Sequence, residues 1–257
     1  MKAVLLAGGL GTRMREETEF RPKPMVEVGG RPVLWHIMKI LGQQGLRDFV
    51  VCAGYRGELI KTYFLNYLAL NQDFTVRLGD TSRVEYHGEH AEWDWNVTVA
   101  DTGAATMTGG RIRRVRRYVD GETFLCTYGD GIADIDLGAL LEFHRSHGRL
   151  ATMTTVQPTS RFGLLDLDDD GMVRRFKEKP QEDGWINIGY FVFEPAIFDY
   201  LAGDDSILER EPLDTLAAQG QIAAYRHRGF WEPMDTFREF QMLNEMWSEG
   251  RAPWRTW

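Results

Sequence analysis

Helical hydrophobic stripes alternate with short apolar β segments through most of this 257-residue chain. Apolar residues recur at the spacing of an amphipathic helix in stripes that begin at Leu34, Ile60 and Leu137, with a shorter stripe at Leu213. Segments typical of strands lie at 46–53, 122–128, 150–156, 186–193 and 221–225. This alternation predicts an α/β fold with a single Rossmann-like, mostly parallel sheet and helices on both faces. Ligands bind to such sheets beyond the carboxyl ends of the strands.

The chain is long enough for one substantial core, so we expect residues 1–257 to form a single domain. The segment at about 71–110 is polar and rich in Thr, Glu and His, and we expect a β-rich excursion there. A hairpin is expected at 164–177, where Asp170-Gly171 separates two alternating segments. A capping box at Thr236 and Glu239 predicts a C-terminal helix and tail at 236–257.

An apolar strand at Ala3–Ala7 runs directly into the turn Gly8-Gly9-Leu10-Gly11-Thr12. Glycines carry no Cβ, so their backbone N–H groups can approach an anion closely. Arg13 closes the turn, and Lys23 follows between two prolines. The spacing is not that of a P-loop, which needs a Gly-Lys pair, nor that of the dinucleotide fingerprint, whose third glycine is replaced by Met14. The glycine turn and the two cations together predict a site for a nucleoside triphosphate.

Two aspartates are candidate ligands of a metal ion. Asp130 stands between two glycines at the end of an apolar strand, where it can reach a hard cation. Mg²⁺ prefers one or two carboxylates together with phosphate oxygens and waters. Asp235 precedes Thr236, which can cap the last helix and leave Asp235 to face a metal. The alternatives are a solvated turn for Asp130 and the capping role itself for Asp235.

The net charge of −8 and the isoelectric point near 5.3 argue against a nucleic-acid-binding protein. The arginine-rich run 111–118 has its apolar residues on one helical face, so most of its arginines are expected to be solvated. Gly109 and Gly110 open that helix, and its N-terminus is a candidate anion site. No apolar run matches a membrane span or a signal peptide, so we expect a cytoplasmic protein with no membrane or nucleic-acid partner. Cys52 and Cys126 are expected to be core thiols.

The motifs at Gly8–Arg13 and Pro22–Met25 resemble the opening of the sugar-1-phosphate nucleotidyltransferases. The stretch 11–40 and the tail at 252–257 are similar to the glucose-1-phosphate cytidylyltransferase branch of that family. The resemblance implies that CTP and α-D-glucose 1-phosphate are joined to give CDP-glucose and pyrophosphate. It also implies catalytic roles for Arg13 and Lys23, Mg²⁺ held by Asp130 and Asp235, and a homo-oligomer, which is a hexamer in that branch.

The resemblance further assigns binding roles by position. Nucleotide-binding roles fall on Leu6, Ala7, Gly8, Gly9, Leu10, Gly11, Thr12, Thr106, Arg111 and Gly129. Roles in binding the sugar phosphate fall on Gly163, Glu178, Lys179 and Asn187. The branch usually reads Asn-Gly-Gly-Phe in this last region, whereas this chain reads Asn187-Ile188-Gly189-Tyr190. Two alternatives stay open: an enzyme of the same fold that uses another pyrimidine triphosphate or sugar 1-phosphate, and a catalytically silent sensor of nucleotide sugars.

Overall fold

The computed structural model describes the chain except for residues 12–13, 15–17, 120, 160–162 and 179–183. Within the described part, a seven-stranded sheet has the order β14-β10-β13-β8-β1-β4-β7. Its strands are β1 (Ala3–Ala7), β4 (Asp48–Ala53), β7 (Asn96–Asp101), β8 (Phe124–Tyr128), β10 (Ala151–Val156), β13 (Ile186–Phe193) and β14 (Ile222–Arg226). Neighbours run parallel except at β13, which is antiparallel to both β10 and β8. The predicted α/β class with a mostly parallel sheet is confirmed.

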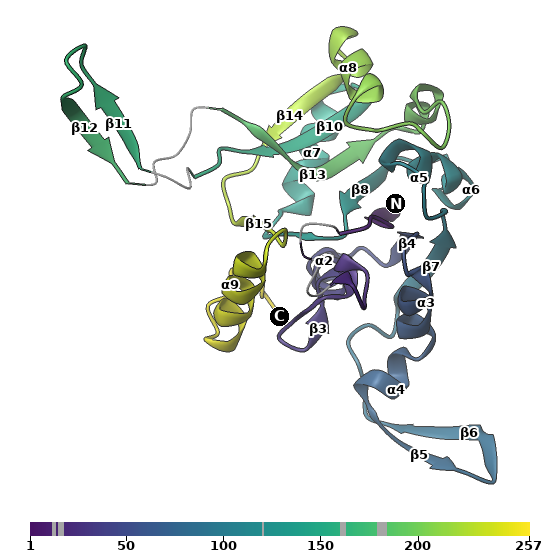
Figure 1. Cartoon of the computed structure of the whole chain (residues 1–257). Helices are drawn as coiled ribbons and strands as arrows, with labels where there is room; N and C mark the ends of the chain where they lie inside the picture. Colours follow the sequence, from purple (N-terminus) through teal and green to yellow (C-terminus); the bar gives the residue numbers. More distant parts are fainter. Residues whose placement is uncertain (12–13, 15–17, 120, 160–162, 179–183) are drawn as a thin grey trace.

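Helices cover both faces of this sheet, as the sequence predicted (Figure 1). The side chains of β1 alternate between the two faces: Leu5 packs in one buried cluster, and Val4 packs in the other. Residues of the following helices pack in the Leu5 cluster: α2 (Val33–Gln43), α3 (Gly57–Leu65), α7 (Leu137–His147) and α9 (Phe237–Ser248). Residues of the following helices pack in the Val4 cluster: α5 (Thr108–Arg114), α6 (Arg116–Val119), η3 (Pro195–Tyr200) and α8 (Glu211–Ala218). A strand that is buried on both faces by two sets of helices is typical of a parallel sheet interior.

Two hairpins project from opposite ends of the body (Figure 1). One consists of β5 (Asp73–Arg77) and β6 (Asp80–His87) and follows the short helix α4 (Tyr67–Asn71). The other consists of β11 (Leu164–Leu167) and β12 (Val173–Lys177), which confirms the hairpin predicted at 164–177. The excursion expected at about 71–110 is too long, because β7 inside that range is an edge strand of the central sheet.

Two short pairings lie beside the sheet. The first joins β2 (Glu27–Val28) to β3 (Arg31–Pro32), and the second joins β9 (Gly131–Ala133) to β15 (Trp231–Pro233). The second pairing connects parts of the chain that are about a hundred residues apart, directly after β8 and directly before α9.

The C-terminal tail is fixed by a histidine that is fully buried among tryptophan rings. Trp254 donates a hydrogen bond from Nε1 to Nδ1 of His36 (3.3 Å), and Nε2 of His36 donates to the carbonyl of Val28 (2.8 Å). Trp247 meets the same imidazole edge-on, with ring centroids 4.8 Å apart. Burial lowers the pKa of His36 to about 4.

Both cysteines are buried free thiols, as expected, and burial raises the pKa of Cys52 to about 12. In the part of the chain that the structure describes, no helix has the length and apolar character needed to cross a membrane.

Candidate active site

The glycine turn lies at the carboxyl end of β1, in the interior of the sheet. Gly8 is buried, and its carbonyl accepts hydrogen bonds from Nη2 of Arg111 (2.9 Å) and from the backbone N–H of Tyr55 (3.2 Å). A Cβ on Gly8 would overlap the Arg111 guanidinium, so any larger residue would displace this hydrogen-bonded side chain. Gly9 and Leu10 are exposed at the tip of the turn. Hydrogen bonds from Arg111 and Tyr55 therefore fix the buried start of the turn, while its tip is exposed to solvent.

The lysine between the prolines belongs to a short 3-10 helix, η2 (Lys23–Met25). Pro24 packs against Gly129: a Cβ on Gly129 would lie 3.1 Å from Pro24 Cγ and 3.1 Å from the Leu6 carbonyl oxygen. That carbonyl accepts a hydrogen bond from the Gly129 N–H at 3.0 Å. These contacts place η2 against the ends of β1 and β8, beside the glycine turn.

The pairing of β9 with β15 brings the two candidate aspartates together. The backbone N–H of Met234 donates to the carbonyl of Asp130 at 2.9 Å, and Asp235 is the next residue. Thr236 is the N-cap of α9, and Glu239 completes the capping box, as predicted. The alternative in which Asp235 caps this helix is therefore wrong, because the capping oxygen is that of Thr236.

Both aspartates form ion pairs with the ammonium group of Lys23. Nζ of Lys23 lies 2.5 Å from Oδ2 of Asp130 and also donates to Oδ1 of Asp235. The side chain of Lys23 is 9% exposed, whereas those of Asp130 and Asp235 are 31% and 21% exposed. The ammonium group is therefore nearly buried between two partly exposed carboxylates. Burial works to lower the pKa of Lys23, but the two carboxylates outweigh it and raise the pKa above its usual value. Three residues from distant parts of the sequence thus form one charged cluster.

Thr106 and Arg111 are both buried. Thr106 lies beside Gly103 and Gly110, whereas Arg111 reaches the glycine turn. The Arg111 guanidinium donates to Oγ1 of Thr102 (2.7 Å) and to the carbonyls of Gly8 (2.9 Å) and Gly103 (2.8 Å). Its positive charge therefore lies directly beneath the turn.

Two donors at the N-terminus of α5, where an anion site is expected, are used within the protein. The N–H groups of Met107 and Gly110 donate to the carbonyls of Asp204 and Ser206, so the loop at 204–206 already uses these donors. Gly109 and Gly110 allow that close approach, because a Cβ on either would overlap this loop.

The positions assigned to the sugar phosphate lie on β13 and at the base of the β11–β12 hairpin. Gly163 lies beside Glu178, since a Cβ on Gly163 would be 3.1 Å from the Glu178 carboxylate. Asn187 begins a tight bend in β13, where Oδ1 accepts a hydrogen bond from the Gly189 N–H at 2.8 Å. Thr12, Arg13 and Lys179 lie outside the described residues.

Comparison with known proteins places the chain in a family. A family model described as nucleotidyl transferase matches residues 2–232. The chain belongs to the nucleotidyl transferase family. It is 52% identical to a glucose-1-phosphate cytidylyltransferase of Salmonella typhi and 45% identical to a probable glucose-1-phosphate cytidylyltransferase of Bacillus subtilis, with all of both chains covered in each case. Among solved structures, HddC of Yersinia pseudotuberculosis aligns with a TM-score of 0.70 at 23% identity, covering 96% of this chain and 99% of that one.

Nucleotidyltransferases of this family generally use a divalent metal ion. The Asp130–Asp235 pair suits such an ion, because Mg²⁺ prefers one or two carboxylates together with phosphate oxygens and waters. The described residues contain no group of three or more His, Cys, Asp or Glu side chains arranged for a metal.

Two groups beside the cluster of Lys23, Asp130 and Asp235 were not predicted from the sequence. The hydroxyl of the fully buried Tyr190 donates to the Gly131 carbonyl at 3.0 Å, next to Asp130. The hydroxyl of Tyr128 donates to the Glu209 carboxylate, and the Tyr128 ring packs on Gly189. A tyrosine among the apolar residues of a strand could have pointed to the Tyr190 contact, because a buried hydroxyl needs a hydrogen-bond partner.

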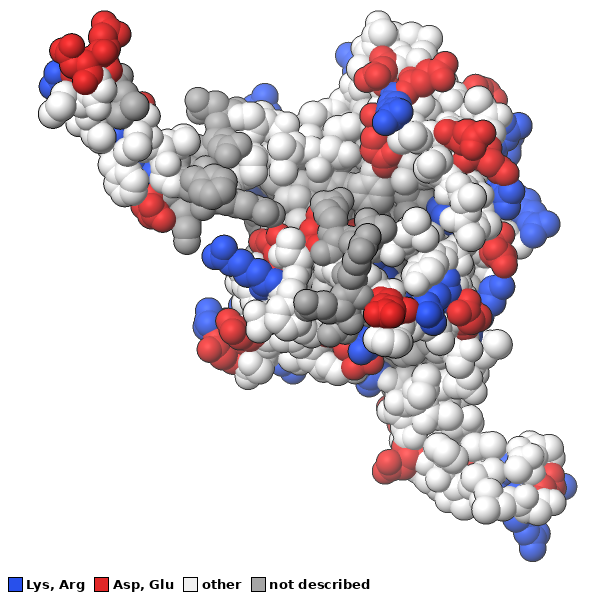
Figure 2. Space-filling view, in the orientation of Figure 1, with Lys and Arg blue, Asp and Glu red and all other residues white. Residues whose placement is uncertain are grey.

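Apart from the buried Arg111, the arginines of α5 and α6 are exposed, as expected, and form part of a mixed surface. Arg114 pairs with Asp204, and Arg113 donates to the carbonyl of Leu201. Figure 2 shows acidic and basic side chains interspersed over this face of the molecule.

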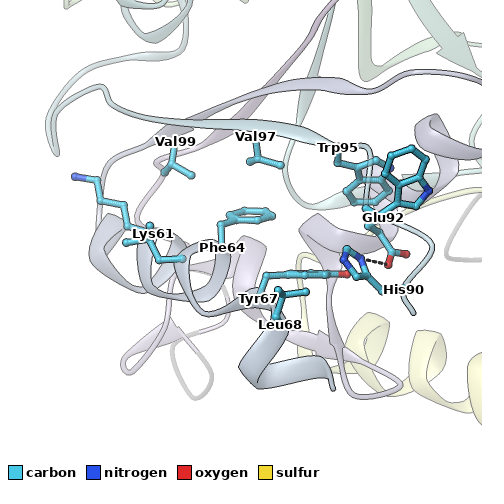
Figure 3. Close-up of a pocket in the computed structure, with 11 residues that line it drawn as sticks. Lys61, Phe64, Tyr67, Leu68, His90, Glu92, Trp95, Val97 and Val99 are labelled. Carbon is cyan, nitrogen blue, oxygen red and sulfur yellow. Dashed lines mark ion pairs between the residues drawn. The ribbon is translucent and has the colours of Figure 1, made fainter. Parts of the chain in front are cut away.

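A separate pocket of about 590 Å³ lies between α3–α4 and the segment that leads into β7 (Figure 3). Phe64, Tyr67 and Trp95 form its walls, with Lys61 at one end and the His90–Glu92 pair at the other. Its lining includes none of the residues predicted for the active site.

Proposed function

We propose that this protein joins CTP and α-D-glucose 1-phosphate to give CDP-glucose and pyrophosphate. The observation that carries the proposal is the cluster of Lys23, Asp130 and Asp235 beside the glycine turn. The choice of base and sugar is supported by the full-length identity of 52% to a relative with that name.

In this reaction an oxygen of the sugar phosphate attacks the α-phosphorus of CTP. A phosphorus–oxygen bond forms there, and the bond to the departing pyrophosphate breaks. The nucleophile is already an anion, so the obstacle is repulsion between two anions and the charge that develops on the leaving group. Catalysis is then a matter of alignment and of fixed positive charge.

The chain supplies both the alignment of the substrates and the fixed positive charge. The backbone of the turn at 8–12 holds the triphosphate, and the buried guanidinium of Arg111 fixes that turn through the Gly8 carbonyl. Lys23 provides a cation for the α-phosphate and the incoming phosphate, and Arg13 provides one for the pyrophosphate. Asp130 and Asp235 would hold Mg²⁺, which would supply positive charge to offset that of the phosphate oxygens. Gly163, Glu178, Lys179 and Asn187 bind the sugar phosphate, and Thr106, Leu6, Ala7 and Gly129 line the nucleotide site.

We also propose a homo-oligomer, as in the hexamer that the resemblance implies. The two projecting hairpins support this, because they expose apolar side chains such as Phe74, Leu165 and Phe176. An isolated two-stranded hairpin is marginally stable in water, and a second copy of the chain could cover these faces.

The test of the proposed reaction is pyrophosphate release by the purified protein with Mg²⁺, each nucleoside triphosphate and a panel of sugar 1-phosphates. Turnover with CTP and glucose 1-phosphate well above every other pair is expected. Preference for another triphosphate or sugar would reassign the substrates. Tight CDP-glucose binding without any turnover would replace the enzyme by a nucleotide-sugar sensor.

A further inference from the structure

The Lys23 ammonium contacts one oxygen of each carboxylate that we assign to the metal. The contact to Asp130 Oδ2 is 2.5 Å, within the range of a charge-assisted hydrogen bond. A divalent cation at this pair needs carboxylate oxygens at about 2.1 Å, so it competes with the ammonium for them.

We propose that Lys23 and the divalent cation exchange at the Asp130–Asp235 pair, so that the lysine must leave the carboxylates before the metal binds tightly. This inference rests on the proposed function for the assignment of the two carboxylates to a metal. In the absence of nucleotide the ammonium balances their charge. The triphosphate offers new anionic oxygens, so the ammonium can move to the phosphates while the metal takes its place.

The structure limits this exchange to the side chain of Lys23. Its backbone belongs to η2, where the Val26 N–H donates to the Lys23 carbonyl at 3.1 Å. Pro22 and Pro24 restrict the chain on either side, and Pro24 packs on Gly129. A flexible four-carbon stem on a fixed backbone can swing between two sets of oxygens without any movement of the fold.

The consequence is a site that takes up metal and nucleotide together. Free Mg²⁺ binds poorly because the ammonium already compensates the carboxylates. A metal that arrives with a triphosphate binds well, because the phosphate oxygens attract both cations.

The test measures Mn²⁺ binding to the nucleotide-free protein by electron paramagnetic resonance, which requires no turnover. Lys23→Met is expected to bind Mn²⁺ about tenfold more tightly than the wild type, or better, because one charge-assisted contact is worth at least that factor. Lys61→Met is the matched control: it also removes one lysine charge, but Lys61 pairs with Asp101, away from the cluster. Its Mn²⁺ affinity should equal that of the wild type. Adding Asp235→Asn to Lys23→Met should abolish the gain.

An unchanged or weaker Mn²⁺ affinity in folded Lys23→Met would overturn the exchange. If that variant does not fold, the wild type provides the second measurement: reductive methylation of Lys23, read by peptide mass spectrometry. Saturating Mn²⁺ is expected to raise the methylation rate of Lys23 and leave that of Lys61 unchanged, and equal rates for Lys23 would contradict the exchange.

The two proposals fail separately. An active wild type whose Lys23→Met variant gains no Mn²⁺ affinity keeps the proposed function and rejects the exchange. A tenfold gain in a protein that turns over no nucleotide keeps the exchange and rejects the proposed reaction.

Discussion

The buried histidine that fixes the C-terminal tail links the stability of this protein to pH. His36 is fully buried, and its two ring nitrogens serve opposite roles: Nε2 donates to the Val28 carbonyl, and Nδ1 accepts from Trp254. Only the neutral ring can do both. Protonation would place an Nδ1–H against the Trp254 N–H, inside a ring of aromatic side chains and near Arg31.

The lowered pKa of His36 determines whether stability rises or falls with pH. Burial lowers the pKa of His36 from 6.5 to about 4, so the unfolded chain takes up a proton first as the pH falls. The stability that the neutral ring contributes is complete above pH 6.5 and declines between pH 6.5 and pH 4. Linkage gives a loss of about 2 kcal/mol between pH 7.5 and pH 5 from this one group.

Urea unfolding of the wild type and of His36→Gln at pH 7.5 and pH 5 isolates this contribution. Glutamine can still donate to Val28 and accept from Trp254, but it does not titrate. The variant should be less stable at pH 7.5 because of poorer packing, and its loss of stability on going to pH 5 should be smaller than the wild-type loss by about 2 kcal/mol. Equal losses in the two proteins would show that His36 is not the source of this pH dependence.

Three further predictions concern the site. Lys23→Ala should lower the rate in single-turnover assays by about a hundred- to a thousandfold, the usual cost of one preorganised charge, and a loss below about tenfold would rule out its proposed role. Tyr190→Phe should reduce the free energy of unfolding by about 1–2 kcal/mol, because the Gly131 carbonyl loses its hydrogen-bond donor. It should also raise the Mg²⁺ concentration needed for half-maximal activity. An unchanged Mg²⁺ requirement would show that Tyr190 does not position Asp130. Gly189→Ala should lower the free energy of unfolding in urea more than Gly171→Ala does. Both glycines have φ near +80°, but only at Gly189 would the new Cβ overlap a ring, that of Tyr128. Equal losses of stability in the two variants would contradict this prediction.

Local patterns in the sequence predicted much of the fold. The stripe at Leu34, Ile37, Met38 and Leu41 is the buried face of α2, and the capping box of Thr236 and Glu239 starts α9. These features depend on residues three or four positions apart, so the sequence carries them directly.

Contacts between distant segments could not be predicted in the same way. Lys23 meets Asp235 from 212 positions away, and Arg111 meets the Gly8 carbonyl from 103 positions away. The donors at the start of α5 are used by a loop some hundred residues further on, which local sequence does not reveal. The antiparallel direction of β13 and the place of β7 at the sheet edge likewise follow from topology rather than from periodicity.

Asp235→Asn shows whether Asp130, Asp235 and Lys23 form one catalytic centre. Its capping box is retained through Thr236, so the variant should fold. A matched control is Asp136→Asn, which replaces the N-cap of α7 by an equally good cap away from the cluster. With CTP, glucose 1-phosphate and Mg²⁺, we expect kcat/KM for pyrophosphate release to fall by about a hundred- to a thousandfold in Asp235→Asn and to stay near the wild-type value in Asp136→Asn. Activity of folded Asp235→Asn within about tenfold of the wild type would exclude Asp235 from the catalytic centre.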